Sequence, residues 1–222
     1  MALRPVQDRI DACVDTRIDA LVQDLRPVRP LPPAGLRALA WLAAACLIGL
    51  ALAALAETVD LRARLATPDL RLAAAGALLT AVTAAYAAFA TSVPGRPAAW
   101  ALLPVPAAAL WIGASGLGCL RAYLAPAAVA EAQTGLGCFG FLTAVSLPLS
   151  VLLVLMLRRA CPLRPNLTAA LGGLATAAAA ATLLVPFHPE EATATDIAIH
   201  GATVVAVIAL NGLAGGRLLA RS

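Results

Sequence analysis

The sequence predicts an all-α integral membrane protein: a bundle of six transmembrane helices preceded by a short amphipathic helix. The chain of 222 residues is 61% hydrophobic. Its apolar residues gather into six stretches of about 20 residues, the length that a helix needs to cross a bilayer. None of the six stretches contains Asp, Glu or Arg, and the 16 basic residues, all of them Arg, lie outside the stretches. Charges are therefore confined to tails and loops.

The first predicted element is an amphipathic helix with a Pro-rich linker, in residues 1–35. Its apolar residues recur three and four apart, as on one helical face: Val6, Ile10, Cys13, Val14, Ile18, Leu21, Val22 and Leu25. Four aspartates, the first Asp8 and the last Asp19, form an acidic stripe beside that face. Helices that lie on membranes usually carry basic polar faces. The acidic stripe instead favours docking onto a basic cytoplasmic protein, and proteins that bind DNA are the obvious candidates.

The membrane domain is predicted to cover residues 36–216, and residues 217–222 form a C-terminal tail. Charged residues separate its spans, which are Ala38–Ala56, Leu72–Ala90, Ala98–Leu117, Leu136–Leu157, Leu167–Val185 and Ile197–Ala214. Twelve Arg lie in the N-terminal tail, the second and fourth loops and the C-terminal tail. Because cytoplasmic segments are enriched in Arg, these segments are predicted to face the cytoplasm, together with both termini.

Small residues and prolines predict how the spans pack. Ala169 and Gly173, like Gly212 and Gly216, lie four apart, a spacing that lets helix backbones approach closely. Pro residues remove a backbone donor and crowd the preceding turn. We therefore expect kinks at Pro104, Pro106 and Pro148.

The polar groups inside the spans argue against several function classes. They are mostly hydroxyls, which helices normally satisfy with their own carbonyls, and they comprise Thr80, Thr83, Thr143, Ser146, Thr203, Asn211 and His200. Ion-coupled transport needs ionisable groups at membrane depth, and the predicted spans have none there. No catalytic carboxylate pair, Ser/His/Asp set or phosphate-binding Gly loop is found. An enzyme is thus not predicted, whereas a transporter or channel for a small neutral solute stays as an alternative.

Cysteine and histidine residues gather at the outer ends of the predicted spans. Cys119 and Cys138 frame the third loop, His188 ends the fifth span, and His200 lies about one turn into the sixth. Thiolate and imidazole together suit zinc or cadmium. A disulfide between Cys119 and Cys138 would close a loop of about 20 residues and stabilise by roughly 3 kcal/mol. Spacing does not choose between these two, and no resident cofactor is predicted beyond a transient heavy-metal ion.

Several segments resemble the NrsF family of membrane anti-sigma factors, in an order that runs over nearly the whole chain. They are DALVQDLRPVRPLPP, FATSVPGRPAAWALLPVPAAALWIGASGLGC, GCFGF, LRRACPLRPNLTAALGGLA and FHPEEATATDIAIHGA. The resemblance implies six spans in the bacterial inner membrane and an extracytoplasmic-function sigma factor as partner, without direct contact to nucleic acid. Under this hypothesis the sigma factor binds the apolar face of the tail, at Val6, Ile10, Val14, Ile18, Leu21 and Leu25.

The resemblance also implies a sensor of heavy metals or oxidative stress. The family has a pair of extracytoplasmic cysteines, near the start of span four and at the end of span five. The first falls on Cys138 and the second on His188, so this chain departs from the two-thiol pattern. A disulfide between those two positions is impossible here. Metal ligation by Cys138 and His188, helped by Cys119 or His200, is the remaining prediction.

Overall fold

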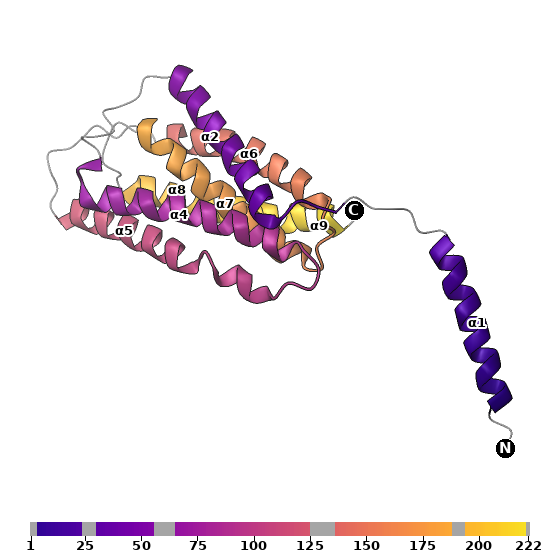
Figure 1. The fold of residues 1–222 in the computed structure, drawn as a ribbon. Coiled ribbons are helices and arrows are strands. Elements are labelled where there is room, and N and C mark those ends of the chain that lie inside the picture. The colour runs from indigo at the N-terminus through magenta and orange to yellow at the C-terminus, as the bar shows by residue number, and fades with distance from the viewer. Residues whose placement is uncertain (1–3, 24–29, 56–64, 125–135, 188–193, 221–222) are drawn as a thin grey trace. The chain divides into compact units, whose positions relative to one another are not determined.

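The computed structural model describes residues 4–23, 30–55, 65–124, 136–187 and 194–220. It divides the chain into two compact units, Met1–Leu31 and Pro32–Ser222. The first contains helix α1 (Arg4–Gln23). The second contains, in order, α2 (Ala34–Leu55), α4 (Pro68–Thr91), the 3-10 helix η1 (Ala98–Leu102), α5 (Val105–Leu124), α6 (Leu136–Arg158), α7 (Pro165–Leu184), the 3-10 turn η2 (Val185–Phe187), α8 (Ala194–Leu210), the π turn η3 (Asn211–Gly215) and α9 (Gly216–Ala220) (Figure 1).

Six helical segments in the second unit are long and apolar enough to cross a membrane, counting only the described residues. Every described element is helical, so the predicted all-α membrane bundle is confirmed. The first segment starts at Ala34, one turn before the predicted Ala38. The Pro33 carbonyl accepts the first helical hydrogen bond, from the Arg37 amide 3.2 Å away.

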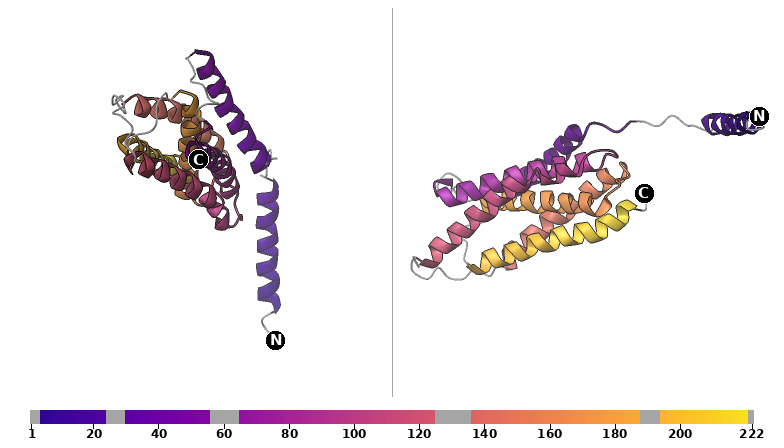
Figure 2. Two further views of the ribbon diagram at one scale, coloured as in Figure 1. Left: turned by 90° about the vertical axis from the view of Figure 1, so that its left-hand side faces the viewer. Right: turned by 90° about the horizontal axis from the view of Figure 1, so that it is seen from below.

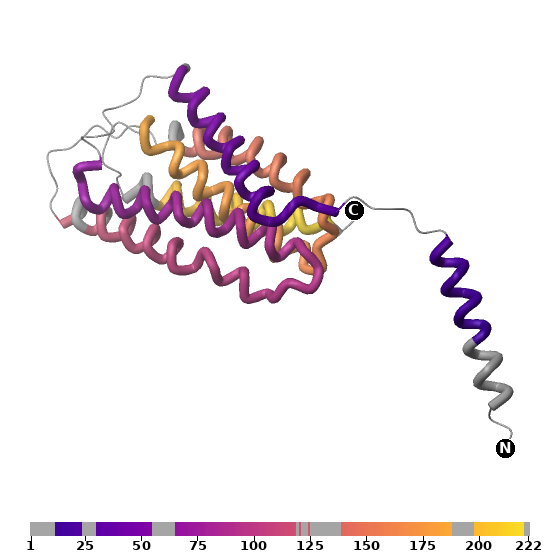
Figure 3. The backbone as a smooth tube through the Cα atoms, viewed as in Figure 1, coloured from indigo at the N-terminus to yellow at the C-terminus, as the bar shows by residue number. Residues whose placement is uncertain are grey.

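Three of the described spans depart from a continuous α-helix, and one of them is the fifth, which ends in the 3-10 turn η2. The third begins as the 3-10 helix η1 and becomes α-helical after Pro104, so a break at this proline is confirmed. The sixth continues past the predicted end at Ala214, through the π turn η3 into α9. The fourth span, α6, runs through Pro148 without interruption. Figure 3 traces these paths along the backbone.

Helices α4 and α7 form the centre of the bundle (Figure 2). Of their most apolar stretches, 50% and 56% of residues are buried, against 11% to 39% in the other spans. Most of the buried residues are alanines, such as Ala84, Ala88, Ala175 and Ala178, each with no exposed surface. Short side chains let the two helix axes approach closely, which is how helices associate where lipid offers no hydrophobic drive.

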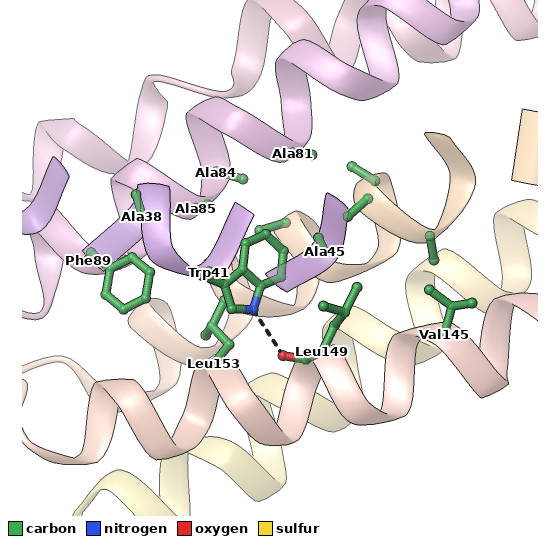
Figure 4. Packing of buried hydrophobic residues seen from close by; sticks show 14 of the residues in the cluster. Ala38, Trp41, Ala45, Ala81, Ala84, Ala85, Phe89, Val145, Leu149 and Leu153 are labelled. Carbon is green, nitrogen blue, oxygen red and sulfur yellow. Dashed lines mark hydrogen bonds between the residues drawn. The ribbon is translucent and has the colours of Figure 1, made fainter. Parts of the chain in front are cut away.

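A tryptophan ties the first span to this core. Trp41 of α2 is completely buried, and its Nε1 donates a hydrogen bond to the Leu149 carbonyl of α6 at 3.1 Å. Figure 4 shows the indole between the alanines of α4 and the leucines of α6. A buried indole N–H needs a partner, so this hydrogen bond fixes which turn of α6 lies beside α2.

Glycines mark the closest approaches between helices. A Cβ on Gly173 of α7 would lie 2.9 Å from the Ile208 Cα of α8, and a Cβ on Gly215 would lie 3.2 Å from the Ala169 Cβ. The small residues around Ala169 and Gly173 therefore face those of the sixth span, which confirms the predicted close packing. Gly76 of α4 is tighter, because its Cβ would lie 2.6 Å from the backbone nitrogen of Trp111 in α5.

Gly76→Ala should destabilise the bundle, because the added methyl group meets backbone that cannot rotate away. Overpacking of this kind costs about 1–3 kcal/mol, and thermal or steric-trap unfolding of the full chain in bicelles would measure it. Gly113→Ala is the control, since a Cβ at Gly113 meets nothing within 4 Å. Equal stability of the two variants would contradict the close α4–α5 contact.

Candidate functional site

The tail helix α1 carries an exposed row of large apolar side chains. Val14, Ile18, Leu21 and Val22 expose 48%, 50%, 69% and 56% of their surface. They lie three or four residues apart or side by side, so they share one face of the helix. We call these four residues the apolar stripe. Asp15 and Asp19 are exposed beside it.

The helical part of the tail prediction holds for the residues that are described. Val6 and Ile10 lie in the helical part of α1, but their side chains are outside the description, and Leu25 lies outside it altogether. The part of the predicted contact surface that can be described therefore consists of the apolar stripe and its two neighbouring carboxylates. An exposed apolar row beside like charges is suited to insertion into an apolar groove with a basic rim.

The predicted sensing residues are only partly described. Cys119 lies in the last turns of α5 and Cys138 in the first turn of α6, but their side chains are outside the description, as is all of His188. His200 is partly buried in α8. The predicted metal site at Cys138 and His188 thus stays a prediction. The other three cysteines, Cys13, Cys46 and Cys161, are exposed.

Arg37 is a functional candidate that the sequence did not reveal. It lies in the first turn of α2 and is only 5% exposed. Its Nη2 donates to the Phe89 carbonyl at 3.1 Å and to Ser92 Oγ at 3.0 Å, and its guanidinium carbon lies 5.0 Å from the centre of the Phe89 ring. Its Nε and Nη1 find no hydrogen-bond partner among the described residues.

These contacts place a positive charge at the C-terminus of α4. Carbonyls in the last turn of a helix lack helical partners, and the helix dipole favours a cation there. Ser92, which caps α4, also donates to the Phe89 carbonyl, at 2.7 Å. Arg37 thus fastens the start of α2, where the chain enters from the tail, to the end of α4. Arginines next to a span are normally counted as topology signals, which is why the sequence alone did not single this one out.

The hydroxyls within the spans are mostly satisfied by their own helices, as expected. Thr80, Thr83 and Thr203 each donate to a carbonyl four residues earlier, at 2.6–2.7 Å. Asn211 bridges helices, because its Nδ2 donates to Ser150 Oγ at 3.0 Å and to the Val207 carbonyl at 2.8 Å. Ser146 Oγ is buried without a partner in the described part of the chain. Within the described part of the chain, most of these hydroxyl and amide groups are thus engaged in hydrogen bonds.

The family model described as NrsF, negative regulator of sigma F, matches residues 21–221. The match starts inside α1, so it covers Leu21 and Val22 of the apolar stripe but not Val14 or Ile18. Neither the search of curated proteins nor the search of solved structures gave a match. Because the family model covers nearly the whole chain, this multi-pass membrane protein belongs to the NrsF family, the negative regulators of a sigma factor.

Proposed function

We propose that this protein is an anti-sigma factor of the bacterial inner membrane that sequesters an extracytoplasmic-function sigma factor through α1. In this proposal both termini are cytoplasmic, and the sigma factor is released when a metal ion or an oxidant acts on the outer face. The family assignment supports a sigma factor as partner. The proposal adds the class of sigma factor, the contact surface and the signal.

The observation that carries the proposal is the apolar stripe of α1. Its four side chains are between 48% and 69% exposed, and the helix belongs to a unit separate from the bundle. Exposed apolar side chains on a short helix gain stability when a partner covers them. Asp15 and Asp19 beside the stripe suit the basic surface of a protein that binds DNA. A sigma factor held in this way is kept from RNA polymerase.

The signalling half of the proposal rests on residue chemistry. Cys138 and His188, with Cys119 or His200 near them in the predicted topology, offer one soft and one borderline ligand on the outer side. Metal binding would draw together the start of α6 and the end of the fifth span. No resident metal is required, because the ion acts as the signal.

Arg37 offers a route from the bundle to the tail. The linker from α1 enters the bundle at α2, whose first turn Arg37 holds against Phe89 and Ser92. In the proposed mechanism, a shift of α4 moves the start of α2 through this contact and so changes how the tail leaves the bundle.

Ile18→Asp should abolish tight binding of the sigma factor while the membrane domain stays folded. Burial of an Ile side chain contributes about 1.5–3 kcal/mol, so its loss alone weakens binding at least about tenfold. Binding of the sigma factor to the full chain in nanodiscs, followed by interferometry, would measure this. Thr16→Asp is the control, since it adds the same charge on the opposite face of α1. Similar affinities for the two variants would remove the apolar stripe from the interface.

Cys138→Ser should prevent release of the sigma factor by cadmium or peroxide, measured with a sigma-dependent reporter. Cys46→Ser should respond normally, because Cys46 is an exposed thiol on α2, away from the predicted outer cluster. His188→Ala separates the two chemistries: metal ligation predicts loss of the cadmium response alone. A normal response of Cys138→Ser to both agents would exclude Cys138 from sensing.

Arg37→Ala should leave the affinity of the resting protein for the sigma factor unchanged, because α1 is intact. Induced release should fall severalfold, because α2 is no longer fastened to the end of α4. The same reporter and binding assays measure both quantities, and thermal unfolding checks that the bundle is intact. Arg96→Ala, in the loop after α4, is the matched control. Normal induction in a stable Arg37→Ala variant would show that this contact does not transmit the signal.

A further inference from the structure

A groove of about 350 Å³ runs between α6 and the sixth span. Its walls are two facing rows of apolar side chains, with Leu147, Val151 and Leu155 on α6 and Leu210, Ala214 and Leu218 on the other side. Residues three and four apart on a helix share a face, so each row runs along its helix. Leu147, Val151, Leu155 and Leu210 are more than half exposed, which places the groove on the surface of the bundle.

The floor of the groove offers few hydrogen bonds. Asn211 Nδ2 is already engaged with Ser150 Oγ and with the Val207 carbonyl. Ser146 also lines the groove, but its hydroxyl oxygen is buried. A polar solute would leave its own hydrogen-bonding groups unsatisfied there, at a cost of several kcal/mol per group in an apolar site. A hydrocarbon chain incurs no such cost.

One end of the groove carries a positive charge. Arg158, the last residue of α6, lines that end and is exposed. It makes no ion pair with an acidic side chain among the described residues, and the loop between α6 and α7 contains Arg159 and Arg164 but no acid. An apolar channel that ends at a cation has the chemical pattern of an amphiphile with an anionic head.

The length of the groove fits one leaflet of a bilayer. Ser146 and Arg158 are twelve residues apart on α6, which corresponds to about 18 Å at the rise of an α-helix. Half of the hydrocarbon core of a bilayer is about 15 Å thick. A lipid whose phosphate meets Arg158 would therefore extend its chain to the level of Ser146, near the middle of the membrane.

We infer that this groove binds one anionic phospholipid, with its phosphate on Arg158 and an acyl chain between α6 and the sixth span. In the proposed topology the lipid belongs to the cytoplasmic leaflet, where anionic lipids concentrate. Arg158 and Ala214 are the two positions that decide the binding, one by its charge and the other by the space beside it. The inference adds a lipid ligand to the proposed protein partner.

Native mass spectrometry of the full chain, released from nanodiscs of equal phosphatidylglycerol and phosphatidylcholine, tests the inference. The wild-type chain should keep one phosphatidylglycerol. Arg158→Gln should lower the retained fraction about fivefold, the effect of one arginine near an anionic surface, whereas Arg159→Gln, beside the groove, should not. Ala214→Phe should fill the groove and abolish retention. Ala43→Phe, on an exposed position of α2, is its control.

Three results would overturn the inference: equal retention by Arg158→Gln and Arg159→Gln, equal retention of both lipids by the wild type, or displacement of the lipid by inorganic phosphate. A dimer without bound lipid would show instead that a second copy of the chain covers the groove. Thermal unfolding verifies that each variant folds. If Ala214→Phe fails to fold, the pair at positions 158 and 159 still decides, because both arginines are exposed.

Discussion

The close contact of α4 with α7 is the constraint on which the rest of the bundle depends. Lipid tails are as apolar as leucine, so helices in a membrane associate by close van der Waals contact and not by escape from water. Alanines with no exposed surface, such as Ala84 and Ala178, permit that approach. The other spans pack around this pair: α5 against α4 at Gly76, α8 against α7 at Gly173, and α2 against α4 and α6. For the packing of the helices, the size of the side chain at these positions matters more than its chemical type.

Arg37 shows how a charge is accommodated at the edge of such a bundle. A buried arginine is costly unless it finds partners, and here the partners are the capping Ser92 and the Phe89 carbonyl at the end of α4. The dipole of α4 adds to their effect, because its C-terminal end is negative. The location of Arg37 also matters, because the chain passes from the tail to the bundle within one turn of this residue. The contact therefore couples the position of α4 to the path of the linker.

The spans could be predicted from the sequence because a charged side chain within the membrane is energetically costly. The uncharged stretches between charged residues therefore mark the helices. It could not anticipate the π turn at Asn211, because Gly212, Gly215 and Gly216 permit several helical windings and the hydrogen bond from Asn211 to Ser150 depends on the distant helix α6. Arg37 escaped notice because its burial depends on Phe89 and Ser92, more than fifty residues away. The tail stripe could be read from periodicity. The sequence could not decide between metal ligation and a disulfide for Cys119 and Cys138, because both depend on distances between side chains that the spacing in the sequence does not fix.

In the proposed mechanism, helix α6 is the element best placed to carry an outer signal inward. Cys138 lies in its first turn and Arg158 at its other end, so the helix joins the proposed sensing side to the proposed cytoplasmic side. Midway, the Leu149 carbonyl holds Trp41 of α2, directly after Pro148. Proline removes one backbone hydrogen bond and makes that turn the easiest place to bend. A pull on Cys138 would thus reach α2 through the Trp41 hydrogen bond. Coupling of this kind needs a physical contact that both sites bias. The hydrogen bond from Trp41 to Leu149 is such a contact, and Trp41 lies on α2, the same helix that Arg37 fastens to α4.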